Sequence, residues 1–470
     1  MAMWIVPGAP LAAGAGWRIW YSRPGHGDFR PEPVQVFRSE KQEETESQEW
    51  NLLPDLAGLD RRMGILTLKL ATPKPGALYE IQLPEVSSSE PFRWRSLPDS
   101  IEPEGFSFMF ASCFWRPNDK EGHYAEAVKA LHKLHPFAFK LLIGDQVYCD
   151  WPADYTPDFG AQSEVKLCAD RYREYWGDEK YREMMGTSPN FFTCDDHEFW
   201  NDYPERQMHL TRSWEKYREP YSQAAQALYD RYQKQNNPEG KPWYRFTIKP
   251  VSFFVTDTRS QRDFHREDGK AHFMPEEEWA ELELWVKQLQ GPGVLVLGQP
   301  IFQKDGDWKD RSLSNFVDDY SRLWHVIEDS LRGNNDENKP HDILVLSGDI
   351  HTGRHAMGQR EDMAVHELIA SPACMISPGG SEPTEPDYKF TVGRGQDRRT
   401  WSVKTDPFMT RDDQVGAVRI RPGTNGRVAF DLGLWQIRPV DDRRWWEKTI
   451  GAERQEGRFR FMYQKEIQLR

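Results

Sequence analysis

Five short polar clusters that follow apolar, strand-like runs are the residues best suited to chemistry. They are Ala111-Ser112-Cys113, Gly144-Asp145-Gln146-Val147-Tyr148, Asp195-Asp196-His197-Glu198, Asp257-Thr258-Arg259 and Gly348-Asp349-Ile350-His351. In an open α/β sheet, side chains at the carboxyl ends of strands converge on one crevice, however far apart they lie in sequence. Because thiol, carboxylate, phenol and imidazole groups all bind cations, the set predicts a single metal site.

The clusters around Asp145 and Cys113 each have an ordinary alternative. A lone Gly-Asp is typical of a turn, but Tyr148, three residues on, offers a phenol that can become an anionic ligand beside a trivalent cation. Tyr148 alone would read as a packed tyrosine. A lone cysteine such as Cys113 is usually a small buried apolar group. Together at strand ends, the three favour metal binding.

Four titratable side chains stand in a row from Asp195 to Glu198, after Phe191-Phe192-Thr193. Like charges at this density are costly unless a cation or solvent offsets them, so the cluster suggests metal or acid–base chemistry, with a solvated loop as the alternative. Asp349 and His351 again set a carboxylate and an imidazole at a strand end, although one Asp-x-His also arises by chance.

Arg259 follows another strand-like run, where its guanidinium fork is suited to phosphate oxygens, with Asp257 orienting it. An internal salt bridge is the equal alternative for this arginine. The clusters lack the serine setting of a hydrolase nucleophile elbow.

Composition excludes several classes of protein. The chain has 470 residues and a formal net charge of −13, which argues against a nucleic-acid partner, and no apolar run approaches a membrane span. Five cysteines without a CxxC pair predict a reduced interior. The N-terminus lacks the basic start of a secretory signal, so we expect a cytoplasmic protein. Nothing in the sequence specifies an oligomeric state.

The periodicity predicts two domains. Residues 1–100 alternate apolar and polar side chains with period two, as in Leu66, Leu68 and Leu70, which predicts a small all-β sandwich. From residue 105 to 470 the pattern is α/β. It has strand-like runs at 106–112, 137–143, 190–194, 251–257, 293–298 and 342–347 and helical stretches at 164–186, 205–235 and Pro275–Gln290. Residues 377–415 are polar and rich in turn formers and predict a loop, whereas 415–470 return to strand alternation.

Over about residues 106–372 the sequence resembles the alkaline phosphatase D (PhoD-like) family of calcineurin-like metallophosphoesterases. The resemblance is carried by the five clusters, by Asn201 and Ser260, which follow two of them, and by Leu297-Gly298-Gln299. It implies a β-sandwich core flanked by helices, after an N-terminal β-sandwich. It also implies a ferric ion held by Cys113, Asp145, Tyr148 and His351, with Asp145 shared, and one or more divalent ions, calcium in the best-understood branch, held by Asp196 and Asp349. Asn201 and Arg259 would contact the phosphate, and His197 would stand near the leaving-group oxygen.

These features predict an alkaline-phosphatase-type enzyme that hydrolyses small phosphate monoesters, with cations that activate water and neutralise the phosphoryl oxygens. A phosphodiesterase that uses the same metals is the nearest alternative. A catalytically silent protein that keeps the metals for binding or structure is the alternative from a different class.

Overall fold

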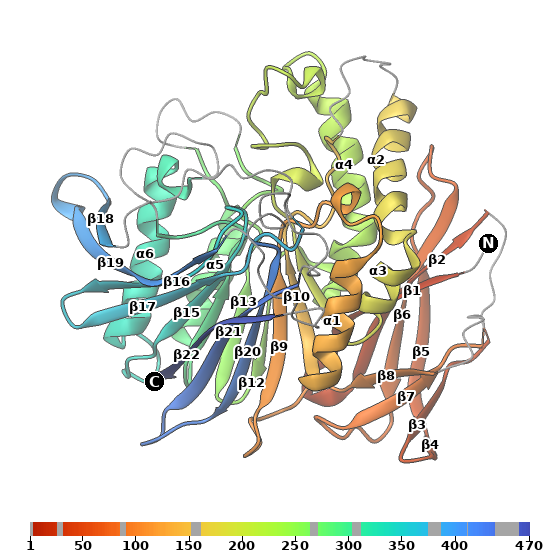
Figure 1. Cartoon of the computed structure of the whole chain (residues 1–470), viewed down its shortest axis with the longest axis horizontal. Helices are drawn as coiled ribbons and strands as arrows, with labels where there is room; N and C mark the ends of the chain where they lie inside the picture. Colours follow the sequence, from red (N-terminus) through yellow and green to blue (C-terminus); the bar gives the residue numbers. More distant parts are fainter. Residues whose placement is uncertain are drawn as a thin grey trace, which may run out of the picture.

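The computed structural model describes residues 3–25, 32–84, 91–151, 161–263, 271–302, 312–374, 387–410, 412–437 and 460–470. Two larger sheets face each other at the centre of the molecule, helices cover their outer faces, and a smaller all-β unit lies at the N-terminal side (Figure 1).

The N-terminal residues form two four-stranded antiparallel sheets. One has the order β1-β2-β6-β5, the other β4-β3-β7-β8. Alternation along β6 explains the packing, because Leu66 and Leu68 enter the core between these sheets, whereas Met63 and Ile65 point to the helices of the rest of the chain. The strands are β1 (Trp4–Pro10), β2 (Gly16–Pro24), β3 (Gln35–Arg38), β4 (Lys41–Glu43), β5 (Thr45–Leu52), β6 (Arg61–Leu70), β7 (Leu78–Gln82) and β8 (Phe92–Arg95).

The following residues form a six-stranded sheet, β11-β10-β9-β20-β21-β22, and an eight-stranded sheet, β12-β13-β14-β15-β17-β16-β19-β18. Their strands are β9 (Phe106–Ala111), β10 (Phe137–Ile143), β11 (Asn190–Thr193), β12 (Tyr244–Ile248), β13 (Val251–Val255), β14 (Gly293–Val296), β15 (Ile343–Ser347), β16 (Gly353–Arg360), β17 (Met363–Ile369), β18 (Asp387–Val392), β19 (Arg399–Thr410), β20 (Gln414–Pro422), β21 (Val428–Gln436) and β22 (Arg460–Leu469).

The six predicted strand runs are β9, β10, β11, β13, β14 and β15. In each sheet, three of them run parallel to one another, β9 with β10 and β11, and β13 with β14 and β15. Their carboxyl ends therefore lie at the same edge of each sheet, which is where the polar clusters follow.

One apolar core fills the space between the two sheets, and a second and third lie on their outer faces. Along β10, Leu141 belongs to the central core and Leu142 to an outer one, as alternation requires. Helices α1 (His123–Leu134), α2 (Ala161–Trp176), α3 (Glu179–Met185) and α4 (Arg218–Tyr232) pack on the six-stranded sheet, and α5 (Glu276–Lys287) and α6 (Val317–Arg332) on the eight-stranded sheet. In α5, Pro275 caps the predicted helix, and Trp279, Leu282 and Val286 are its buried stripe. The helix expected over 205–235 is shorter, because only α4 is α-helical there.

The prediction of a loop over 377–415 is wrong for its described residues. β18 and β19 pair antiparallel and extend the eight-stranded sheet. Tyr388, Phe390, Trp401 and Val403 alternate with polar residues and enter the core beside α6, which supplies the burial that stabilises both strands. Residues 375–386, including the Ser377–Gly380 run, lie outside the described residues.

The C-terminal residues complete the six-stranded sheet. β20 pairs antiparallel with β9, and β21 and β22 follow outward, as the alternation of Val418, Ile420, Val428 and Phe430 predicts. Phe459, the first apolar residue of the last predicted alternation, lies outside the described residues. No helix in the described part of the chain is long and apolar enough to span a membrane.

Candidate metal centre

Side chains from the ends of both sheets meet at one point. Potential ligand atoms lie within 4.8 Å of one another in three groups, which are Cys113, Asp145 and His351; Asp145, Asp196 and His197; and Asp145, Asp195, Asp196 and Asp349. Asp145 belongs to all three groups, so the site is one continuous centre with a shared carboxylate.

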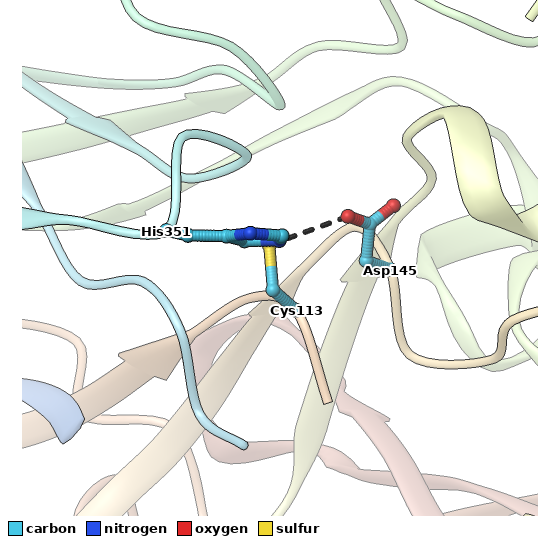
Figure 2. Close-up of side chains that lie close together, drawn as sticks. All are labelled: Cys113, Asp145 and His351. Atoms are coloured by element: carbon cyan, nitrogen blue, oxygen red, sulfur yellow. Dashed lines mark hydrogen bonds between the residues drawn. The ribbon is translucent and has the colours of Figure 1, made fainter. Parts of the chain in front are cut away.

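The first group joins the loops that follow β9, β10 and β15. Figure 2 shows Cys113 beside the imidazole of His351, with the Asp145 carboxylate opposite. The Cys113 thiol donates to Asp145 Oδ2 at 3.3 Å, and Ser371 Oγ donates to Cys113 Sγ at 3.1 Å. Ser371 Oγ also accepts the backbone N–H of His351 at 3.1 Å and thereby links two of the three side chains.

The third group brings four carboxylates so close together that a protein without bound cations could not keep all of them ionised. Asp145, Asp195 and Asp196 are buried within reach of one another and of Asp349. Burial, and after it the charge of Asp196, raises the pKa of Asp145 well above its usual value. Burial likewise raises the pKa of Asp195, against the lowering effect of Arg259. Such a site gains most from positive charge placed among the oxygens.

The backbone of four candidate ligands is left-handed. The φ angles are +59° at Cys113, +53° at Asp145, +68° at Asp349 and +52° at His351. Non-glycine residues adopt this conformation at a cost, and such residues concentrate at functional sites, where the surrounding structure holds them. The four side chains are therefore aimed by their loops, and extended strand geometry alone would not bring them together.

Gly144 allows the loop after β10 to approach the loop after β11. Its φ is +76°, and a Cβ at this position would lie 2.5 Å from the Cβ of Asp195. Any larger residue would push the Asp145 and Asp195 loops apart.

Glu198 holds the loops after β10 and β11 in place by accepting hydrogen bonds from their backbones. Its Oε2 accepts the backbone N–H groups of Asp145 and Asp195, each at 2.9 Å, and its Oε1 accepts the backbone N–H of Gln146 at 2.7 Å and Nε2 of Gln233 at 3.1 Å. The side chain is fully buried. Glu198 is thus a positioning residue, whereas the sequence indicated only a member of a cluster suited to metal or acid–base chemistry.

His197 lies at the margin of the centre, with 13% of its side chain exposed. Its Nδ1 is 2.9 Å from Asp150 Oδ1, whose second oxygen accepts the backbone N–H of Asn201 at 2.9 Å. The imidazole packs on Tyr148, with 4.0 Å between the ring centroids. Burial lowers the pKa of His197, but Asp150 and two further carboxylates outweigh it and hold the pKa well above its usual value. These carboxylates therefore favour the protonated form of the imidazole.

Arg259 has the internal salt bridge, and the structure gives it no surface for phosphate. The side chain is fully buried, its Nε donates to Asp195 Oδ1 at 2.8 Å, and its Nη1 donates to the Tyr203 carbonyl at 2.6 Å. Asp257 accepts the backbone N–H groups of Arg259 and Ser260. The prediction that Arg259 contacts phosphate is corrected, because the arginine is needed to neutralise a buried aspartate.

Asn201 is half-buried and close to the centre. Its Nδ2 donates to Asp202 Oδ2 at 2.8 Å, and the backbone N–H of Asp202 donates to Asp196 Oδ2 at 2.5 Å. A phosphate contact by Asn201 stays a prediction.

The donor set fits metal cations. The Tyr148 phenol oxygen is buried and has no hydrogen-bond partner among the described residues. Burial, followed by the charge of Asp145, raises its pKa well above the usual value, so a cation is what would release its proton. Soft thiol, imidazole, phenol and shared carboxylate ligands suit a transition metal, and the all-carboxylate side suits a hard divalent ion.

Sequence reasoning missed Asp150, Ser371 and the roles of Asp195 and Glu198. Asp150 has a faint signal in its position two residues after Tyr148. Ser371 has none, because it reaches Cys113 only through the fold.

Comparisons with known proteins identify the family of the chain. The family model described as PhoD-like phosphatase matches residues 108–423. A solved structure of PhoD superposes with a TM-score of 0.60 at 16% identity, covering 92% of this chain and 86% of that one. GAP50, the anchor in the inner membrane complex of Plasmodium, gives a TM-score of 0.36 at 17% identity over 70% of this chain and 84% of that one. A search of curated sequences gave no match. The chain belongs to the PhoD-like phosphatase family and shares the fold of PhoD.

Proposed function

We propose that this protein is a metal-dependent phosphatase that hydrolyses small phosphate monoesters. The observation that carries the proposal is the set of overlapping ligand groups that share Asp145. Membership of the PhoD-like phosphatase family supports a phosphoric ester hydrolase.

In this proposal Cys113, Asp145, Tyr148 and His351 hold a ferric ion, and Asp145, Asp196 and Asp349 hold one or more divalent ions, calcium being our choice. When bound, these cations activate a water molecule and neutralise the phosphoryl oxygens. An acidic chain of net charge −13 repels a phosphate ester, so a positively charged centre is needed for it to bind. Asn201, which donates to Asp202 in the free protein, would donate to a phosphoryl oxygen when the substrate is bound.

His197 gives the departing oxygen its proton. The imidazolium is oriented through Nδ1 by Asp150 at 2.9 Å, which leaves Nε2 to donate. A general acid matters most when the departing alkoxide is a strong base. His197→Ala should therefore slow alkyl phosphates far more, by about 10²–10⁴-fold, than nitrophenyl phosphate, whose phenolate leaves unaided. Equal losses on both esters, accompanied by lost metal, would make His197 a ligand instead.

Asp150→Asn is the matched variant, because it keeps the size of the side chain while removing the charge that holds His197 protonated. It should move the alkaline limb of the rate profile, where the general acid loses its proton, to lower pH without changing metal content. Metal analysis of the purified chain, with rates on paired mono- and diester nitrophenyl substrates before and after chelation, tests the proposal as a whole. A metal-free protein with full activity, or a metal-loaded protein that turns over neither ester, would contradict it.

A further inference from the structure

Two tryptophans stand on the loops that leave the metal centre. Trp115 lies two residues after Cys113, and Trp151 lies three residues after Tyr148. Their rings meet edge to face, with centroids 5.9 Å apart and planes inclined by 75°. Trp151 is 39% exposed, and it is the exposed tryptophan among the described residues. Burial of so large a ring is favourable, so its exposed part offers apolar area to a ligand.

Both loops are fixed on their inner side. Phe114, next to Trp115, stacks on Tyr181 with centroids 4.9 Å apart, and its backbone N–H donates to the Asp145 carbonyl at 2.9 Å. Asp150, next to Trp151, is buried and accepts from Asn201 while it contacts His197. The indoles are therefore held at a fixed position relative to the candidate ligands, as a binding surface requires.

The closeness of the pair to the centre indicates its ligand, because two residues of chain after Cys113 and three after Tyr148 span at most about 7 and 11 Å. Trp151 is one peptide unit from the carboxylate that orients His197, and His197 in the proposed function faces the oxygen that leaves. In a phosphate monoester the group on that oxygen is the whole organic part, which has to extend outward past the loops around the centre. Indole rings bind flat apolar groups by stacking and by edge contacts.

We propose that Trp151, supported by Trp115, forms a subsite for a flat aromatic leaving group of the phosphate ester. The inference rests on the proposed function and adds a substrate class to it, namely esters of aryl alcohols or of nucleosides.

The test measures binding of hydrolysis-resistant phosphonates to the full, metal-loaded chain by calorimetry. Trp151→Ala should weaken binding of naphthylmethyl phosphonate about tenfold and change binding of methyl phosphonate less than twofold, with Trp151→Phe between. Phe461→Ala is the matched control. Phe461 is 42% exposed and pairs with Trp435, with 4.6 Å between the ring centroids. It lies on β22, the edge strand at the opposite end of the sheet from β11, and β20 and β21 separate it from β9.

Equal weakening of both phosphonates by Trp151→Ala, or no weakening of either, would overturn the subsite. A purine nucleoside phosphonate in a third titration separates the two sources of the ring. If Trp151→Ala weakens binding of both aromatic phosphonates, the subsite accepts aromatic groups in general. If it weakens binding of only one of them, the subsite is specific for that class of ester. The proposed function is judged separately, since hydrolysis without a Trp151-dependent preference refutes the subsite alone, whereas Trp151-dependent binding without hydrolysis refutes the reaction alone.

Discussion

The Glu198 carboxylate holds the loops after β10 and β11, and its exchange for glutamine measures how much that arrangement matters. Each of its oxygens accepts two N–H groups, from Asp145 and Asp195 on one side and from Gln146 and Gln233 on the other. Glutamine has one acceptor oxygen. Whichever way its amide turns, two donors lose their acceptor and face another N–H group.

The size of the effect follows from these bonds. A hydrogen bond to a charged group contributes about 1.5–3 kcal/mol, so two lost bonds correspond to roughly 3–6 kcal/mol. Part of this loss is offset, because burial raises the pKa of Glu198 and a neutral amide is easier to bury. We expect a net loss of about 3 kcal/mol in the free energy of unfolding.

Urea unfolding of wild type and Glu198→Gln, each with metal and after chelation, provides the assay. Glu281→Gln, the same chemical change on the exposed face of α5, is the control and should leave the midpoint unchanged. The variant should also bind its metals more weakly, because Asp145 and Asp195 lose their backbone anchor. An unchanged midpoint together with unchanged metal affinity would refute the reasoning.

Three further predictions concern other buried groups. Tyr148→Phe should abolish a visible charge-transfer band of the iron-loaded protein and leave the fold intact, and a colourless, iron-free, fully active wild type would contradict the ferric assignment. Arg259→Ala should lower the free energy of unfolding by about 3–5 kcal/mol, because Asp195 stays buried without its ion-pair partner. A marked loss of substrate affinity at unchanged stability would instead support a phosphate contact by Arg259. Burial lowers the pKa of His355 and of His366 from 6.5 to about 4. Between these pH values the folded state binds fewer protons than the unfolded chain, so the free energy of unfolding should fall as the pH drops from 6.5 to about 4. The double variant with glutamine at both positions should lose much of this slope, and an unaltered slope would contradict it.

The convergence of the candidate ligands could be predicted from sequence because parallel strands put their carboxyl ends at one edge. Asp145 and Asp349 each follow a run of apolar residues, and those runs became β10 and β15. The two strands lie in different sheets, yet their ends meet because the sheets face each other across one core. An apolar run followed by an aspartate was sufficient to predict the position of that aspartate, because the direction of the strand determines at which edge of the sheet the side chain lies.

Partners that cross between sheets could not be predicted in the same way. The guanidinium of Arg259 comes from the loop after β13, and its carboxylate partner, Asp195, comes from the loop after β11 in the other sheet. Sequence reasoning assigned Asp257, the nearest carboxylate along the chain, to this arginine and gave no reason to choose Asp195. The left-handed backbone at Cys113 and His351 is equally hidden, since neither residue type signals it.

The β18–β19 hairpin was missed for a different reason. Gly, Pro and polar residues dominate the surrounding stretch, and the alternation of Tyr388, Phe390 and Val392 is too short to outweigh them. Tertiary packing against α6 decides the outcome, because burial on one face stabilises a strand that local propensity leaves undecided.

The N-terminal sandwich contributes to the site through the helices it covers. Trp20 packs on Tyr232 of α4 with centroids 5.3 Å apart, and its Nε1 donates to the Arg231 carbonyl at 2.7 Å. Gln233 follows directly and donates to Glu198, which anchors the metal loops. The division near residue 100 stays a prediction about domains, but the packing does not stop there. A continuous path of buried contacts leads from Trp20 through the end of α4 to the carboxylate beneath the metal centre.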